Sequence, residues 1–239
     1  MTTLPDASVA VILPAAGSGQ RFGDQSNKLF APLAGRPLWT HAAETLLRRD
    51  EVSCLWLAVS PGDREQLEEQ AAMLSRPDKI HFVNGGAERS DSVAAALDAV
   101  AQAAEASIQW VAVHDAARPL LRAEDVSSVL ACAAHTRAAI LATPVTGTLK
   151  RGARDQSACQ TLDRRGIWVA QTPQVFSLDL LRQAYASHRG RPATDDAELV
   201  ERTGHPVALV AGAADNLKIT YPEDLAVAEA LLQSRTHLS

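Results

Sequence analysis

The sequence predicts an α/β fold in which helices cover both faces of a mostly parallel sheet. Short apolar runs alternate with longer stretches of helical periodicity, which is the pattern of strand–helix–strand units. Of the 239 residues, 46% are hydrophobic and only 4% are aromatic, and such an aliphatic composition suits helices that pack closely on a parallel sheet. Because right-handed crossovers place successive strands in one sheet, we expect a single domain over residues 1–239.

Each strand is predicted from a short apolar run that ends in turn residues. In chain order, these runs are Val9–Leu13, Cys54–Val59, Ile80–Val83, Ile108–Val113 and Ala139–Thr143. The first helices are predicted between them, at Leu38–Arg48, Pro61–Leu74, Ser90–Ala104 and Arg122–His135. The later elements are two helices, a strand and a final helix, at Leu178–Ser187, Asp195–Thr203, Val207–Val210 and Thr220 to about Leu232.

Two of these helices have strong start signals. Ser60 before Pro61 predicts an N-cap serine followed by a first-turn proline. Thr220 and Glu223 have the spacing of a capping box, in which each side chain bonds to the backbone N–H of the other residue.

The alternation of strands and helices fails between Pro144 and Pro173. This segment holds three glycines, scattered charges and short β-prone pieces, and it has no helical stretch. Because an excursion of this length is uncommon inside a compact domain, we predict a β-arm over about 144–173 that leaves the domain. A small β-arm buries little apolar surface by itself, so we also predict a two-fold homodimer in which the arms pack against the partner.

The first strand runs into a loop of small residues, and two cations follow it. Small residues let backbone N–H groups approach phosphate oxygens, and Arg21 and Lys28 can neutralise the charge of the same ligand. The loop predicts a nucleoside triphosphate site, although it also fits a strand-to-helix turn that binds nothing. No Gly-Lys-Ser/Thr follows, as a Walker A motif requires, and Phe22 stands where a dinucleotide fingerprint needs its third glycine.

The string HDAARP, residues 114–119, comes at the end of a predicted strand. A carboxylate at that edge, facing a phosphate loop, is well placed to bind Mg²⁺ together with substrate phosphates, so Asp115 is the candidate metal ligand. The alternative is that Asp115 caps the helix that starts near Arg122. Arg118 can contact a phosphate or steady the loop, and His114 is expected to be structural because it has no His or Cys partner.

Three further places could carry binding groups, and each has a simpler reading. The paired glycines Gly85 and Gly86 permit close approach of a ligand to the helix that contains Ser92, or they form a capped turn. Lys218 lies in a β-prone run, where a lone lysine is usually a solvated edge residue. Thr194 precedes two acids and fits the N-cap of a helix.

Composition excludes several classes of protein. A net charge of −5 argues against a nucleic-acid partner, although a small phosphorylated substrate needs only a local basic cluster. Three widely spaced cysteines (Cys54, Cys132 and Cys159) form no metal or disulfide pattern and predict reduced thiols. No apolar run approaches membrane-spanning length, so we expect no membrane partner and a cytoplasmic location.

Together the motifs resemble those of the 2-C-methyl-D-erythritol 4-phosphate cytidylyltransferase family of the non-mevalonate isoprenoid pathway. The matching strings, in order, are VILPAAGSGQRF, GGAERSDSV, HDAARP, TLDRRGIW, TPQVF, TDDAELVE and NLKITYPEDL. They extend roughly from Val9 to Leu232. The resemblance implies a Rossmann-like nucleotidyltransferase domain that transfers CMP from CTP to 2-C-methyl-D-erythritol 4-phosphate and releases pyrophosphate. The sequence departs from the family pattern at Gln20, Leu29 and Ala87, none of which is assigned a role in the chemistry.

The resemblance also implies a role for each matching position. The triphosphate would be wrapped by Ala15, Ala16, Gly17, Ser18 and Gly19. The reacting phosphates would contact Arg21, Lys28 and Lys218, and Mg²⁺ would bind Asp115. Cytosine would be read by Gly86 and Ser92, together with Ala15 and Ala16. The polyol phosphate acceptor would be held by Arg118, Thr148, Arg164, Thr172 and Thr194, some of them from the arm of a second subunit.

Three other functions compete with this one. A ribitol 5-phosphate cytidylyltransferase would share the nucleotide half of the site and differ only in acceptor residues. An NADP-dependent dehydrogenase is disfavoured by the broken fingerprint. A nucleotide-binding module without catalysis would keep the glycine loop but should lose Lys28 or Asp115, and both are present.

Overall fold

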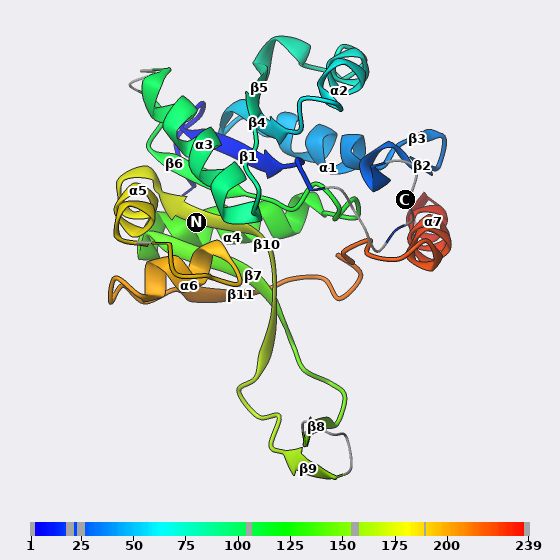
Figure 1. Ribbon diagram of the computed structural model, residues 1–239, viewed down its shortest axis with the longest axis vertical. Helices are drawn as coiled ribbons and strands as arrows, with labels where there is room; N and C mark the ends of the chain where they lie inside the picture. Colours follow the sequence, from blue (N-terminus) through cyan, green and yellow to red (C-terminus); the bar gives the residue numbers. More distant parts are fainter. Residues whose placement is uncertain are drawn as a thin grey trace.

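The computed structural model describes residues 3–17, 22, 27–103, 107–153, 158–188 and 190–236. A seven-stranded sheet with the order β11-β7-β10-β6-β1-β4-β5 forms the centre (Figure 1). Its strands are β1 (Val9–Pro14), β4 (Val52–Val59), β5 (Ile80–Asn84), β6 (Trp110–Val113), β7 (Ala138–Pro144), β10 (Trp168–Ser177) and β11 (Ala208–Ala211). The helices are α1 (Leu38–Leu47), α2 (Arg64–Ala71), α3 (Arg89–Gln102), α4 (Ala123–Thr136), α5 (Leu178–Ser187), α6 (Asp196–Glu201) and α7 (Glu223–Thr236).

Shorter elements connect this framework. Two are 3-10 helices, η2 (Lys28–Phe30) and η3 (Pro77–Lys79). The others form two small antiparallel sheets, one of β2 (Pro32–Leu33) and β3 (Arg36–Pro37) and one of β8 (Leu149–Gly152) and β9 (Cys159–Leu162).

The predicted α/β fold with a mostly parallel sheet is confirmed. β1 runs parallel to β4 and β6, so that Val11 lies between Leu55 and Ala112, and β5 and β11 are also parallel to their neighbours. The exception is β10, which runs antiparallel to both β6 and β7 in the middle of the sheet. The sequence did not predict this strand, because its first residues were assigned to the arm.

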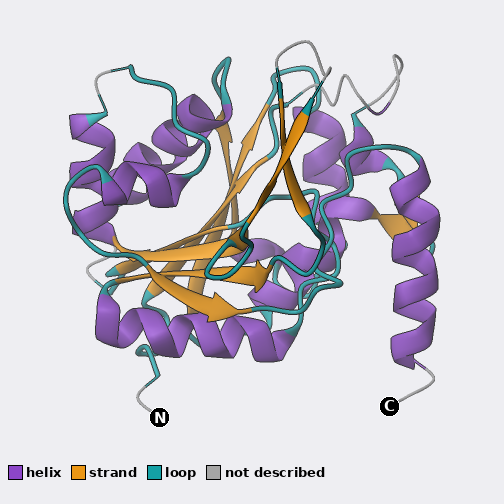
Figure 2. Cartoon of the chain, turned by 90° about the horizontal axis from the view of Figure 1, so that it is seen from below, coloured by secondary structure: helices purple, strands orange, loops and turns teal. Residues whose placement is uncertain are grey.

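Helices lie on both sides of the sheet (Figure 2) because side chains of each strand alternate between its faces. Val11 of β1 packs in one apolar cluster with residues of α1, α2, α4 and α7. Its neighbour Ile12 packs in a second cluster with residues of α3, α5 and α6. Burial of one such side chain contributes about 1.5–3 kcal/mol, so these two layers hold the strand ends in place. In the described part of the chain, no helix is long and apolar enough to cross a membrane.

Both strong helix-start predictions need correction. α2 begins after Asp63, and Ser60 is not its cap: the Ser60 hydroxyl donates instead to the Asp63 carboxylate, Oγ to Oδ2 2.7 Å. At α7 the backbone N–H groups of Thr220 and Tyr221 donate to Asp224 Oδ2, at 2.7 and 2.9 Å, rather than to Glu223. In both places the predicted capping residue was wrong. The carboxylate of Asp63 accepts the bond from Ser60 before α2, and the carboxylate of Asp224 accepts the backbone bonds at the start of α7.

The segment between β7 and β10 projects away from the sheet, with β8 and β9 at its far end (Figure 1). β8 and β9 pair antiparallel from Leu149↔Leu162 to Gly152↔Cys159. At the base of this arm β10 starts by pairing Trp168 with Pro144 of β7. The apolar side chains of Ile167, Trp168 and Val169 are exposed there.

Candidate active site

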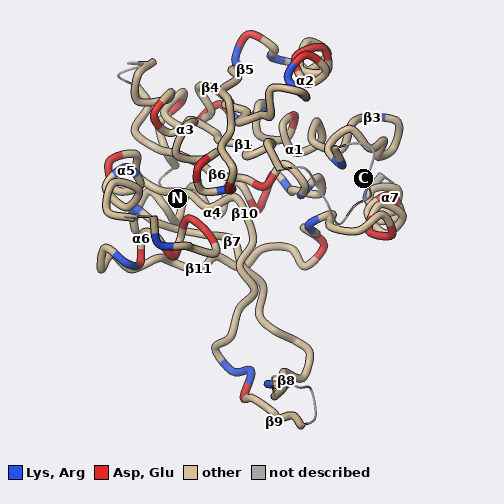
Figure 3. The backbone as a smooth tube through the Cα atoms, in the orientation of Figure 1, with Lys and Arg blue, Asp and Glu red and all other residues tan. Residues whose placement is uncertain are grey.

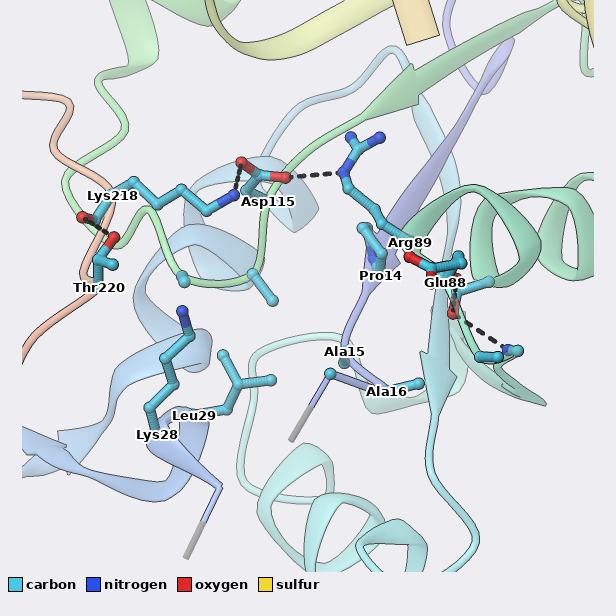
Figure 4. A pocket seen from close by; sticks show the side chains of 16 residues that line it. Pro14, Ala15, Ala16, Lys28, Leu29, Glu88, Arg89, Asp115, Lys218 and Thr220 are labelled. Atoms are coloured by element: carbon cyan, nitrogen blue, oxygen red, sulfur yellow. Dashed lines mark hydrogen bonds and ion pairs between the residues drawn. The ribbon is translucent and has the colours of Figure 1, made fainter. Parts of the chain in front are cut away.

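The carboxyl ends of β1, β5 and β6 lie at one edge of the sheet, as expected for parallel strands. They enclose a cavity of about 400 Å³ (Figure 4), a volume within the usual range for small-ligand sites. Its wall includes six predicted nucleotide and phosphate residues, namely Ala15, Ala16, Gly17, Lys28, Gly86 and Ser92. Asp115 and Lys218 complete the predicted set around this space. The candidates Ser18, Gly19 and Arg21 lie outside the described residues.

The loops after β1 and β5 approach each other closely at Gly85. A methyl group on Gly85 would lie 2.4 Å from the Ala16 Cβ and 2.8 Å from the Ser92 Oγ, so only glycine fits between them. The Ser92 hydroxyl accepts a hydrogen bond from the Gly86 backbone N–H, at 3.1 Å, and so fixes the shape of the loop. Glu88 closes the start of α3 by a capping box with Asp91. The capped turn and a ligand-facing loop are therefore compatible readings of the same residues.

Lys28 enters the cavity from η2. Asn27 caps this short helix, its Oδ1 accepting from the Leu29 N–H at 3.1 Å and its amide donating to Asp63 Oδ2 at 2.9 Å. The Lys28 ammonium donates to the Ile219 carbonyl at 2.9 Å, which links η2 to the segment that carries Lys218. Figure 4 shows the ammonium groups of Lys28 and Lys218 directed into the same space.

Asp115, at the end of β6, is the centre of the charged groups. Its carboxylate contacts Lys218 Nζ at 2.9 Å, Arg89 Nε at 3.2 Å and Arg118 Nε at 3.5 Å. Burial by itself raises the pKa of Asp115, but the three cations outweigh it and hold that pKa well below its usual range. The alternative role as a helix cap is wrong, because α4 begins after Arg122 and has no side-chain cap.

A buried hydrogen-bonded chain fixes the backbone at Asp115. The Asp115 N–H donates to Thr172 Oγ at 3.0 Å, and that hydroxyl donates to His114 Nδ1 at 3.0 Å. His114 Nε2 donates to the Arg118 carbonyl at 3.1 Å. Burial lowers the pKa of His114 to about 4, so the ring is neutral and both nitrogens serve the fold. This agrees with the structural role predicted for His114.

A second hollow of about 240 Å³ lies beside the first, and Arg89, Asp115 and Lys218 line both. Three of the predicted acceptor residues line the second hollow, namely Arg118, Thr172 and Thr194. Arg118 is held there because its Nη1 donates to the Asn216 carbonyl at 2.8 Å. Asp195, next to Thr194, caps α6 by accepting from the Glu198 N–H at 2.9 Å.

The remaining acceptor candidates, Thr148 and Arg164, are not brought to either cavity. Both are exposed and lie on the arm, beside β8 and β9. The Arg164 guanidinium donates to the Thr146 carbonyl on the opposite side of the arm. Figure 3 shows Lys and Arg residues gathered at this end of the arm.

Arg89 is the site residue that the sequence did not single out. It stands at the start of α3 and joins Asp115 to Asp196 of α6, with Nη2 2.8 Å from Asp196 Oδ2. The string GGAERSDSV contains it, and an arginine that starts the helix just after a glycine pair is the signal that could have drawn attention to it.

Asp115 is the candidate metal ligand at the wall of the cavity. Within the described ranges, no three His, Cys, Asp or Glu side chains cluster closely enough to hold an ion by themselves. One carboxylate at the wall of the cavity fits Mg²⁺ that shares its ligands with substrate phosphates and water, which is how this cation commonly binds. Asp115 thus suits a metal that arrives with a triphosphate rather than a resident one.

The chain matches known proteins over nearly its whole length. The family model of 2-C-methyl-D-erythritol 4-phosphate cytidylyltransferase matches residues 9–234. The enzyme of that name from Rhodopirellula baltica is 60% identical over 233 residues, 95% of each chain. The one from Salmonella typhimurium is 40% identical over 96% of this chain and 95% of that one. The crystal structure of the enzyme from Thermus thermophilus superposes with a TM-score of 0.75 at 37% identity and covers 95% of this chain and 99% of that one.

Proposed function

The chain belongs to the 2-C-methyl-D-erythritol 4-phosphate cytidylyltransferase family, and we propose that its two neighbouring cavities hold the CTP and the acceptor. As a cytidylyltransferase it transfers CMP from CTP to 2-C-methyl-D-erythritol 4-phosphate and releases pyrophosphate, a step of isoprenoid biosynthesis. The main support for placing CTP in one cavity and the acceptor in the other is that the two cavities share a wall. Arg89, Asp115 and Lys218 line both hollows, so two phosphates bound in them would meet at these charges.

The reaction needs alignment and neutralised charge more than a protein nucleophile. A phosphate oxygen of the acceptor forms a bond to the α-phosphorus of CTP, while the bond from that phosphorus to the β-phosphate oxygen breaks in line. The attacking oxygen is already anionic, so no general base has to remove a proton. Lys28 and Lys218, with Arg21 from the glycine loop, neutralise the charge that builds on the phosphates. The cytosine is read largely through backbone groups of the segments that carry Ala15, Ala16, Gly86 and Ser92.

We assign Asp115 as the protein ligand of a Mg²⁺ ion that enters with CTP. When bound, the ion neutralises phosphate charge and orients the triphosphate. The carboxylate can serve because it stays ionised and its Oδ2 partner, Lys218, is partly exposed and has a flexible stem. The ammonium of Lys218 then leaves Asp115 and contacts the α-phosphate of CTP.

We also assign a homodimer in which the arm completes the acceptor site of the partner. Support comes from the apolar side chains exposed at its base and from the position of Thr148 and Arg164, which neither cavity of their own chain includes. The arm's own two strands enclose little apolar surface, so packing against a second subunit would stabilise it. A cytoplasmic location agrees with the three cysteines, which form no disulfide.

Pyrophosphate release from CTP tests the function and the choice of acceptor together. We expect turnover with 2-C-methyl-D-erythritol 4-phosphate and little with ribitol 5-phosphate, the rival that family membership does not favour. Faster release with ribitol 5-phosphate would overturn the acceptor. Release that remains after Asp115→Asn and Lys28→Ala are combined would overturn the assignment of the cavity.

A further inference from the structure

The two oxygens of Asp115 have different partners. Oδ1 accepts from Arg89 Nε at 3.2 Å, whereas Oδ2 contacts Lys218 Nζ at 2.9 Å (Figure 4). Oδ2 also lies 3.5 Å from Arg118 Nε. The carboxylate is therefore held on one side by α3 and on the other by the segment before α7.

Arg89 is itself anchored from behind. Its Nη2 contacts Asp196 Oδ2 at 2.8 Å, and the side chain of Asp196 is only 1% exposed. The other oxygen of Asp196 accepts from the Tyr185 hydroxyl at 2.5 Å. Charge-assisted hydrogen bonds in a buried setting are among the strongest that proteins form, so the guanidinium has one well-defined position.

Lys218 has no comparable restraint among the described contacts of its side chain. Its side chain is 44% exposed, and its ammonium is a point charge on a four-carbon stem. When phosphates enter the cavity, Lys218 can move to them, whereas Arg89 would have to leave two carboxylates at once. Oδ2 thus loses its shorter contact, the one with Lys218, and keeps only Arg118 Nε at 3.5 Å, whereas Oδ1 remains bonded to Arg89.

We propose that Arg89 is a positioning residue which, anchored by Asp196, holds Asp115 Oδ1 and so presents Oδ2 to the divalent cation that arrives with CTP. This inference rests on the metal-binding role assigned to Asp115 above. Because Arg89 begins α3 and Asp196 begins α6, the same bridge ties the nucleotide loop to the helix that follows Thr194 on the acceptor side.

The planar guanidinium is essential to this role. Arginine presents several N–H donors in a rigid fork and can bond to two carboxylates at once, which a lysine ammonium on a flexible stem does less precisely. Arg89→Lys keeps the charge but loses the bridge. Asp196→Asn keeps the shape but removes the charge that anchors Arg89, so the guanidinium is no longer held in one position against Asp115 Oδ1.

The test is the affinity for CTP, measured by calorimetry in EDTA and in excess Mg²⁺. The ratio of the two affinities reports the metal without any turnover. We expect the ratio to fall about tenfold or more in Arg89→Lys and Asp196→Asn, as is typical when a partner that orients a metal ligand is removed. Affinity in EDTA should fall much less than affinity in Mg²⁺, because Arg89→Lys keeps the positive charge at the wall of the cavity and Asp196 lines neither cavity. A fall in EDTA as large as that in Mg²⁺ would make Arg89 a direct nucleotide contact and overturn the proposal.

Glu51→Gln is the matched control for loss of a buried carboxylate. Glu51 pairs with Arg49 at 2.9 Å, has a side chain 9% exposed, and lies at the opposite end of the sheet before β4. The Glu51→Gln variant should have a lower melting temperature but an unchanged ratio of CTP affinity in Mg²⁺ to that in EDTA. This control separates a loss of stability from a loss of positioning at Asp115.

Asp115→Asn separates the two hypotheses. If it keeps the full Mg²⁺ ratio, the metal role of Asp115 is wrong and the role of Arg89 falls with it. If Mg²⁺ no longer raises the CTP affinity of Asp115→Asn, whereas Arg89→Lys and Asp196→Asn respond to Mg²⁺ like the wild type, the metal role stands and only the positioning role is overturned. Should Asp196→Asn fail to fold, the result with Arg89→Lys decides.

Discussion

Mixing two inactive variants tests whether the arm completes the site of its partner. Lys28 lines the nucleotide cavity, and Arg164 lies exposed on the arm of the same chain, away from that cavity. If each site takes Lys28 from one subunit and Arg164 from the other, Lys28→Ala and Arg164→Ala inactivate every site of their own homodimers. A heterodimer then contains one site that carries both defects and one that carries neither.

The expected recovery of activity on mixing follows from the loss in each variant and from the share of heterodimers. A hydrogen bond to a charged group contributes about 1.5–3 kcal/mol, so loss of the Arg164 contact should lower turnover roughly 10- to 100-fold. After complete exchange of equal amounts, about half of the dimers are heterodimers and half of their sites are intact. Activity should therefore return to about a quarter of the wild-type value per site, well above either variant alone.

The assay is pyrophosphate release before and after subunit exchange, with the exchange confirmed by native mass spectrometry of differently tagged chains. Arg165→Ala is the matched control, because Arg165 neighbours Arg164 but its guanidinium pairs with Asp163 at 2.5 Å. It should remain active without mixing. No recovery after confirmed exchange, or a monomer by sedimentation at assay concentration, would refute a shared site.

Three further changes probe the cavity itself. Lys28→Ala should lower kcat by about 10²–10³ with a modest effect on CTP affinity, since charge builds on the phosphates in the transition state; steady-state kinetics that show only a raised KM would contradict this. Asp115→Asn should raise the Mg²⁺ concentration needed for half-maximal turnover, and an unchanged titration would remove Asp115 from the metal site. Gly85→Ala places a methyl group 2.4 Å from the Ala16 Cβ, so the two loops must separate at a cost of about 1–3 kcal/mol. CTP affinity measured by calorimetry should fall on the order of tenfold, whereas Gly62→Ala, which meets nothing within 4 Å, should bind CTP normally.

Much of the fold could be predicted because its signals are local. The apolar runs that became β1, β4, β5, β6 and β7 are contiguous in sequence, and parallel strands bring their carboxyl ends to one edge. The central strand β10 could not be predicted in this way, because Pro173 lies within it and proline normally argues against a central strand. The structure accommodates it by a register shift against β7 between Ala170 and Gln174.

The site was predictable where a motif is short and was missed where it depends on distant partners. Asp115 lies just beyond the end of β6 and Lys28 follows the loop after β1, and both line the cavity formed by the strand ends. The role of Arg89 depends on Asp196, 107 residues further along the chain, and no local pattern records such a pair. Thr148 and Arg164 belong to no local motif and were predicted only through the family resemblance, and the folded chain leaves both outside these two cavities.

The cavities also explain how an acidic chain can receive two phosphorylated substrates. The net charge is −5, yet Arg89, Arg118 and Lys218 converge on one carboxylate at the common wall. Without Asp115 these cations would repel one another across the hollows. With it, Arg89 and Arg118 are already in place when phosphates arrive and only Lys218 has to turn, so the preorganised charge needs little rearrangement during the reaction. On the proposed mechanism Asp115 thus acts twice, first as the anion that gathers the cations and then as the ligand that accepts the metal when Lys218 turns to phosphate.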